Sequence, residues 1–148
     1  MILKNFIIED NISLLEQYNF LLLYGENDGF KEDMKEKIKE KNKDSEIIIL
    51  FQEEILNNKN ILIDQINNSS LFNSKRIIFL HEITDKVFKQ IIECTEYQDK
   101  DTKIYIFSPV LEKKSRLRNY YEKDKKLGIV PNYKDNERTL IKYINLKL

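Results

Sequence analysis

A turn between two glycines is the part of the sequence whose spacing comes nearest to a known chemical motif. The stretch Gly25-Glu-Asn-Asp-Gly29-Phe-Lys31 follows an apolar run and precedes a charged helical segment, where α/β proteins place a phosphate-binding loop. Such a loop has four residues between its glycines and ends in Lys followed by Ser or Thr, whose hydroxyl binds Mg²⁺. Here three residues lie between the glycines, Glu32 replaces the hydroxyl, and two carboxylates inside the loop would repel phosphate. We expect a turn that does not bind nucleotide.

The remaining reactive side chains lack the neighbours that catalysis or metal binding requires. In an ATPase that has such a phosphate-binding loop, the third strand would end in two carboxylates that hold the metal. This chain has His81-Glu82 there. His81 is the only histidine, and no cysteine lies near it in the sequence, so no metal site is expected. Cys94 has no adjacent histidine, and Ser108 lacks the G-x-S-x-G context of a serine nucleophile. We expect no catalytic residue and no cofactor.

Leu71 and Phe72 form an apolar pair in a stretch of Asn and Ser, just before an apolar run. Two interpretations follow from the residues alone. The pair packs into the core beneath a polar loop, or it is held out at the surface for a partner to bind. From the residues alone, two apolar side chains just before a strand belong to the core more often than to a contact surface, although single exposed apolar side chains are also common on protein surfaces.

A basic run lies in the last third of the chain, between Glu112 and Asn119. A charged stretch of this kind is usually a solvated helix face, and the alternative is a surface for a partner or for DNA. The run consists of Lys113, Lys114, Arg116 and Arg118.

Short apolar runs alternate with segments of helical periodicity along the chain. The expected strands cover residues 20–25, 46–51, 75–83, 103–109 and 129–133. The expected helices cover residues 30–43, 60–68, a segment after Thr84, residues 112–126 with Gly128 as their end, and residues 136–148. The strand runs are continuously apolar, which is typical of parallel strands buried on both faces. This alternation predicts an α/β fold with a five-stranded parallel sheet and helices on both faces.

Bulk composition limits the class of protein. The 148 residues, 41% hydrophobic and 34% charged, suit one folded domain. The 25 basic and 25 acidic residues cancel, so the chain as a whole is not a polyelectrolyte for nucleic acid. One cysteine permits no intramolecular disulfide, no apolar run is long enough to span a membrane, and the N-terminus is a poor signal peptide. We therefore expect a cytoplasmic protein without membrane contact.

Four segments, taken in order, resemble one protein family. They are LLLYGENDGF at 21–30, SSLFNSKRIIFL at 69–80, SPVLEKKSRLRNYYEK at 108–123 and VPNYKDNERTLIKYI at 130–144. Together they resemble the N-terminal domain of the delta subunit of the bacterial DNA polymerase III clamp loader. The likeness covers nearly the whole chain and rests on the order and spacing of the segments.

The resemblance implies a fold related to the AAA+ and RecA-like ATPases, with strand order 5-1-4-3-2 and without ATP hydrolysis. It implies that residues 1–135 form the clamp-binding domain and that residues 136–148 begin a helical lid, whose remainder and the collar domain are absent. Leu71 and Phe72 match the apolar pair that the family inserts into the beta sliding clamp, and Ser69 and Ser70 match its polar approach.

The implied task is to bind the sliding clamp and help open it for loading on DNA, as a non-catalytic subunit of the DNA-directed DNA polymerase holoenzyme. The implied partners of the full-length protein are the gamma/tau and delta prime subunits, and primer-template DNA indirectly. The alternative function is a small nucleotide-binding enzyme or switch with a divergent phosphate loop.

Overall fold

The computed structural model describes residues 2, 17–72, 75–97 and 101–132, with the side chains of residues 69–72 left out. Five strands form one parallel sheet, as expected. They are β1 Phe20–Tyr24, β2 Glu46–Phe51, β3 Arg76–His81, β4 Thr102–Ser108 and β5 Gly128–Pro131. The strands lie in the order β2-β3-β4-β1-β5, which reads 5-1-4-3-2 from the other edge of the sheet.

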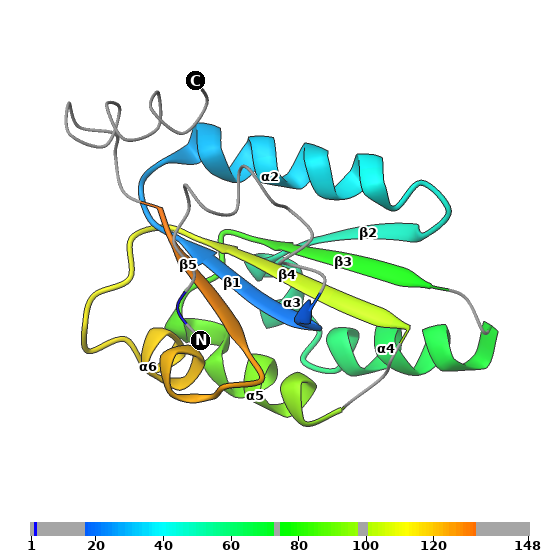
Figure 1. Cartoon of the computed structure of the whole chain (residues 1–148). Helices are drawn as coiled ribbons and strands as arrows, with labels where there is room; N and C mark the ends of the chain where they lie inside the picture. The colour runs from blue at the N-terminus through cyan, green and yellow to red at the C-terminus, as the bar shows by residue number, and fades with distance from the viewer. Residues whose placement is uncertain (1, 3–16, 73–74, 98–100, 133–148) are drawn as a thin grey trace, which may run out of the picture.

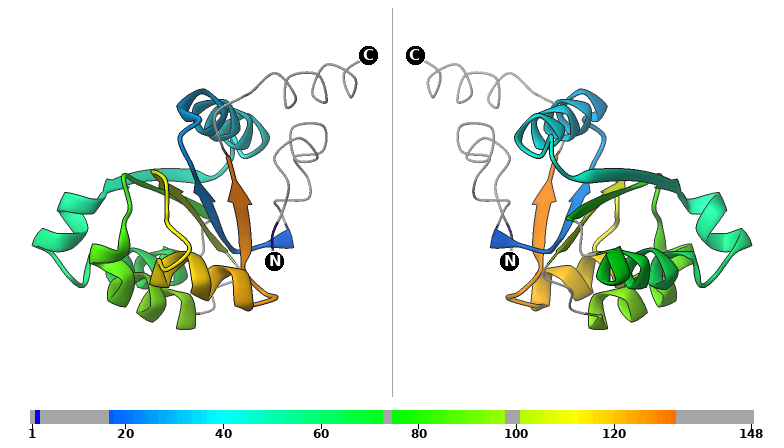
Figure 2. Two further views of the ribbon diagram at one scale, coloured as in Figure 1. Left: turned by 90° about the vertical axis from the view of Figure 1, so that its left-hand side faces the viewer. Right: turned by 90° about the vertical axis from the view of Figure 1, so that its right-hand side faces the viewer.

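Helices cover both faces of this sheet, which confirms the three-layer arrangement (Figures 1 and 2). On one face lies α2. Opposite it lie α3, α4, α5 and α6. Their bounds are α2 Asp28–Lys41, α3 Gln52–Asn57, α4 Ile61–Phe72, α5 Phe88–Glu96 and α6 Arg116–Lys123, with a 3₁₀ turn at Asp85–Val87 before α5. Among these helices, none is both long and apolar enough to cross a membrane.

Two hydrophobic cores result, one on each side of the sheet, and β1 contributes to both. Leu21 and Leu23 face α2, whereas Leu22 faces the four-helix side, and all three are fully buried. On α2 the buried side chains are Phe30, Met34 and Ile38, four residues apart, as the sequence pattern predicts. Because β1 is buried along its whole length, it fixes the position of the turn that follows it at Gly25.

The edge strand β2 differs from the expectation that it is buried. Ile49 is 40% and Phe51 43% exposed, although Leu50 between them is buried in the core. Both exposed side chains lie on the same face of the sheet as α2. This helix covers the inner strands on that face but leaves the edge strand partly uncovered. The sequence also gave no indication of the short α3, whose one buried residue is Ile55.

Helix α6 begins at Arg116, four residues later than expected, because its cap comes from two separate segments. Ser115 Oγ accepts a hydrogen bond from the Arg118 amide at 3.2 Å. The carboxylate of Asp85 accepts from Ser115 Oγ at 2.8 Å, from the Arg116 amide at 3.2 Å and from the Leu117 amide at 3.1 Å. The helix start is thus set by the 3₁₀ turn before α5.

The sequence suggested that Gly128 ends α6. In the structure it is the first residue of β5. A Cβ there would lie 2.4 Å from Leu21 Cδ1 and 3.1 Å from Tyr18 Cγ. The glycine therefore allows Leu21 and Tyr18 to pack closely against the start of β5, where Gly128 pairs with Leu21.

Candidate functional site

The Gly25 turn lies at the carboxyl ends of β1, β4 and β5, where open α/β sheets bind ligands. Gly25 has a φ of +136°, and its amide donates to the carbonyl oxygens of Ser108 at 3.3 Å and Pro109 at 3.2 Å. The Asn132 amide donates to Tyr24 O at 2.7 Å on the other side of β1. The amide of Gly25 therefore points into the protein and not toward a ligand.

The start of α2 is closed by a side chain of the same turn. Asn27 Oδ1 accepts a hydrogen bond from the Phe30 amide at 3.0 Å, and the Asn27 amide donates to Asn132 O at 3.3 Å. A phosphate-binding loop leaves such amides free for phosphate oxygens. Sequence reasoning did not single out Asn132, because a lone Asn after a short strand belongs to no motif.

Lys31 also has protein partners for each of its donors. Its Nζ donates to Gly25 O at 2.9 Å and Ser108 O at 3.0 Å, and pairs with Asp28 Oδ1 at 3.1 Å. An ammonium group has three N–H donors, so these three acceptors use all of them. The side chain is 12% exposed, and it joins β1, β4 and α2 at their common end. Lys31 acts here as a structural cross-link.

Replacing Lys31 by Met should destabilise the domain by about 2 kcal/mol, because two buried carbonyl groups lose a charged donor. Guanidinium unfolding would measure the loss. The control is Lys37→Met, since Lys37 makes only a partly exposed ion pair with Asp33 within α2. That change should cost about 0.5 kcal/mol or less. Equal losses in the two variants would contradict the cross-link.

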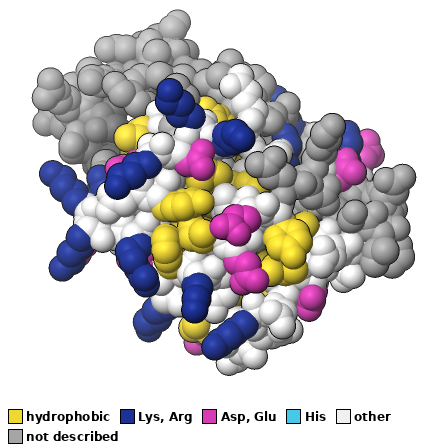
Figure 3. Space-filling model, turned by 90° about the horizontal axis from the view of Figure 1, so that it is seen from below, with side chains coloured by type: hydrophobic (Ala, Val, Ile, Leu, Met, Phe, Trp, Pro, Cys, Tyr) yellow, Lys and Arg dark blue, Asp and Glu magenta, His cyan; other side chains and the backbone are white. Residues whose placement is uncertain are grey.

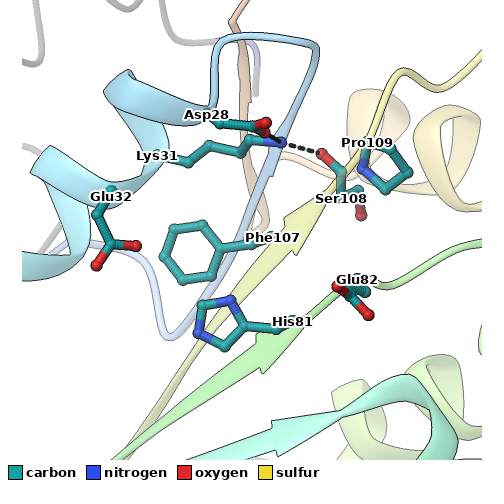
Figure 4. A pocket seen from close by; sticks show the side chains of 8 residues that line it. All are labelled: Asp28, Lys31, Glu32, His81, Glu82, Phe107, Ser108 and Pro109. Carbon is teal, nitrogen blue, oxygen red and sulfur yellow. Dashed lines mark hydrogen bonds and ion pairs between the residues drawn. The ribbon is translucent and has the colours of Figure 1, made fainter.

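A cleft of about 420 Å³ opens beside this cross-link (Figure 4). The residues that line it are Asp28, Lys31, Glu32, His81, Glu82, Phe107, Ser108 and Pro109. Three of them are carboxylates, and the one lysine is already paired. The cleft therefore has the wrong charge for a polyphosphate.

At the end of β3 the backbone turns sharply. Glu82 has a φ of +58°, a left-handed conformation that is uncommon for residues other than glycine. Figure 4 shows its carboxylate across the cleft from Lys31. Ser108 Oγ is buried nearby and has no hydrogen-bond partner among the described residues. The two-carboxylate arrangement of a working ATPase is absent from this strand end.

The His81 ring stacks on Phe107, with centroids 5.0 Å apart and planes 10° apart, and lies 5.4 Å from the Phe51 ring. Partial burial, and then the positive charge of Lys35, lower the pKa of His81 below its ordinary value of 6.5. The imidazole is therefore neutral at pH 7. Within the described part of the chain, no group of three or more His, Cys, Asp or Glu residues could hold a metal ion.

The wild type should lose stability relative to a His81→Phe variant as the pH falls through 6.5. The unfolded chain binds the His81 proton at a higher pH than the folded chain does, so acidification favours unfolding. Phe keeps an aromatic ring between Phe51 and Phe107. Urea unfolding of both proteins at pH 7.5 and 5.5 would check this. A stability difference that is the same at both pH values would contradict it.

Leu71 and Phe72 occupy the last turn of α4 and not a loop. The chain leaves this turn and enters β3 at Arg76, so the pair lies at the amino end of the strands. The Gly25 turn lies at their carboxyl end, and Figure 1 shows the two sites on opposite ends of the sheet. The side chains of Ser69, Ser70, Leu71 and Phe72 are outside the described part of the structure.

Of the four basic residues near α6, three are exposed and one turns inward. Lys113 and Lys114 are exposed ahead of the helix, and the Arg116 guanidinium lies 4.8 Å from the Phe88 ring centre. Arg118 turns inward, where it donates to Leu111 O and to Glu122 Oε1, each at 2.9 Å. Figure 3 shows Lys and Arg side chains along one side of the helical face, beside exposed hydrophobic side chains.

Cys94 is buried within α5, and burial raises the pKa of its thiol to about 12. The thiolate that a nucleophile requires is therefore scarce at neutral pH.

No protein-family model matches the chain, and a search of the curated proteins finds no match either. The fold and the cleft define an α/β domain with a closed turn at the edge where open sheets of this class bind ligands.

Proposed function

We propose that this chain is the N-terminal domain of a clamp-loader delta subunit, which binds the beta sliding clamp and helps open it. The observation that carries the proposal is the closed phosphate loop. Lys31 donates to two backbone carbonyl groups and Asn27 caps α2, so neither side chain is available to a nucleotide. The proposal assigns the parallel sheet to the AAA+ and RecA-like folds. A delta subunit has such a fold but does not hydrolyse ATP. We therefore assign no catalytic activity to this chain.

The clamp-binding element in this proposal is the end of α4. Leu71 and Phe72 enter a pocket on the clamp, and Ser69 and Ser70 form the polar approach to it. Their place supports this role, because the end of a helix at one end of the sheet can reach a partner without disturbing the Gly25 turn. Opening the ring requires no chemistry, since a protein that binds the open form better than the closed form shifts the equilibrium.

The rest of the assignment follows from the same family. The domain boundary near residues 135 and 136 lies outside the described residues. In the full-length protein a lid and a collar would follow. Assembly with gamma/tau and delta prime would go through the collar, with primer-template DNA contacted indirectly. The proposed place of action is the cytoplasm, within the DNA polymerase III holoenzyme.

The experiment that tests the proposal is calorimetric titration of the chain with the beta clamp of its own source. A saturable heat with a stoichiometry set by the clamp protomers is the expected result. A well-folded chain that gives no heat at clamp concentrations of about 100 μM, where a micromolar complex would be saturated, would rule it out.

A nucleotide-binding enzyme or switch is the second candidate, and the cleft beside Lys31 is the observation in its favour. ATP or GTP that raises the melting temperature of the wild type but not of Lys31→Met would support it. We expect neither nucleotide to change the melting temperature, because the cleft is acidic and Lys31 is already paired.

A further inference from the structure

Arg76, the first residue of β3, is a buried cation that reaches back to α4. Its side chain is 6% exposed. One terminal nitrogen donates to Gln65 O and to Gln65 Oε1, each at 2.9 Å, and the other donates to Glu46 Oε2 at 2.9 Å. Glu46 is half exposed and begins β2. The guanidinium therefore joins α4 to two strands of the sheet.

The bond to Gln65 falls at a critical place along α4. After Gln65 and the buried Ile66, the helix continues through Asn67, Asn68, Ser69 and Ser70. Asn and Ser are poor helix formers, and the side chains of Asn67 and Asn68 are exposed. The last turn thus gains little from its own sequence. The described anchors just before it are the bonds from Arg76 to Gln65 and the burial of Ile66.

The geometry requires an arginine. The two terminal nitrogens of the planar guanidinium donate in different directions, one to the helix and one to the Glu46 carboxylate. A lysine ammonium is a compact group on a flexible stem and cannot hold the same fork. The pairing also fixes α4 relative to the strand that immediately follows it.

We propose that Arg76 is a positioning residue for clamp binding, which holds the last turn of α4 in place through Gln65. This inference rests on the proposed function, in which that turn carries the clamp-binding pair. Arg76 itself need not touch the clamp.

The test compares Arg76→Met, Arg76→Lys and Gln65→Met with a matched control, Arg118→Met. Arg118 is also an inward-facing arginine that bonds a carbonyl oxygen and a carboxylate, but it lies in α6 on the other side of α5. Each variant is measured for clamp affinity, for melting temperature and for amide hydrogen exchange of residues 67–72 in the free chain.

We expect Arg76→Met and Arg76→Lys to bind the clamp about tenfold more weakly, with faster exchange at residues 67–72. Gln65→Met keeps the backbone acceptor, so its clamp affinity should fall only about threefold. This variant keeps the test decisive if Arg76→Met does not fold. Arg118→Met should lower the melting temperature but leave both clamp affinity and the exchange of these amides unchanged.

Wild-type affinity in a folded Arg76→Lys and in Gln65→Met would overturn the inference, as would an equal loss of affinity in Arg118→Met. If the wild type does not bind the clamp, the proposed function fails, and the exchange experiment still decides about Arg76. Faster exchange confined to the Arg76 and Gln65 variants would then support its positioning role, and unchanged exchange would overturn it.

Discussion

The Leu71→Ala, Phe72→Ala double variant should lose detectable clamp binding and keep the melting temperature of the wild type. Burial of each side chain in a pocket on the clamp contributes roughly 1.5–3 kcal/mol. Anchors of this kind behave as hot spots, so truncation of either one should cost about 2 kcal/mol, or roughly thirtyfold in affinity. Calorimetric titration with the clamp and a thermal melt of the free chain measure the two quantities.

The control for this experiment is a Leu56→Ala, Val110→Ala double variant. Both residues are large, apolar and exposed, and neither lies at the end of α4. Their truncation should leave clamp affinity unchanged, which separates a specific site from a general loss of apolar surface. A Leu71→Ala variant that loses several kcal/mol of stability would instead place Leu71 in the core, because a cavity has that effect.

Gly25→Ala should destabilise the domain by about 3 kcal/mol or more, the second largest effect that we expect. The φ of +136° is strained for any residue with a Cβ, and that Cβ would lie 1.8 Å from Asn132 O. The backbone after β5 would have to move away, and the hydrogen bond from Asn132 N to Tyr24 O would be lost or stretched. Guanidinium unfolding of the variant measures the cost.

Gly29→Ala is the matched control for this substitution, because it changes the other glycine of the same turn. A Cβ at Gly29 would make one ordinary contact, 3.6 Å from Asn27 Oδ1. Since Gly29 lies in α2, alanine should be neutral or stabilise by up to about 1 kcal/mol. Comparable destabilisation by both substitutions would show that the turn depends on something other than the conformation of Gly25.

The sequence was a good guide wherever structure depends on local pattern. The continuous apolar run before Gly25 predicted a buried parallel strand, and the spacing of Phe30, Met34 and Ile38 predicted the apolar face of α2. The three-layer arrangement follows from such runs because the alternation of strands and helices permits few topologies.

Features that depend on distant partners could not be predicted in the same way. The start of α6 depends on Asp85, some thirty residues away, and the exposure of Ile49 depends on the position of β2 at the sheet edge. The partners of Lys31 include two backbone carbonyl groups, which have no sequence signature. The defects of the phosphate motif could be recognised from the residues alone. The cross-link that Lys31 forms in place of binding phosphate could not.

The place of β1 in the sheet has a consequence for synthesis on the ribosome. Among the described strands its neighbours are β4 and β5, so Leu22 pairs with Ile106 and Ile129, more than eighty residues further along the chain. At the usual speed of translation this apolar strand waits on the order of ten seconds for a partner. During that time Phe20–Tyr24 is an exposed apolar segment on a nascent chain, of the kind that chaperones protect from aggregation.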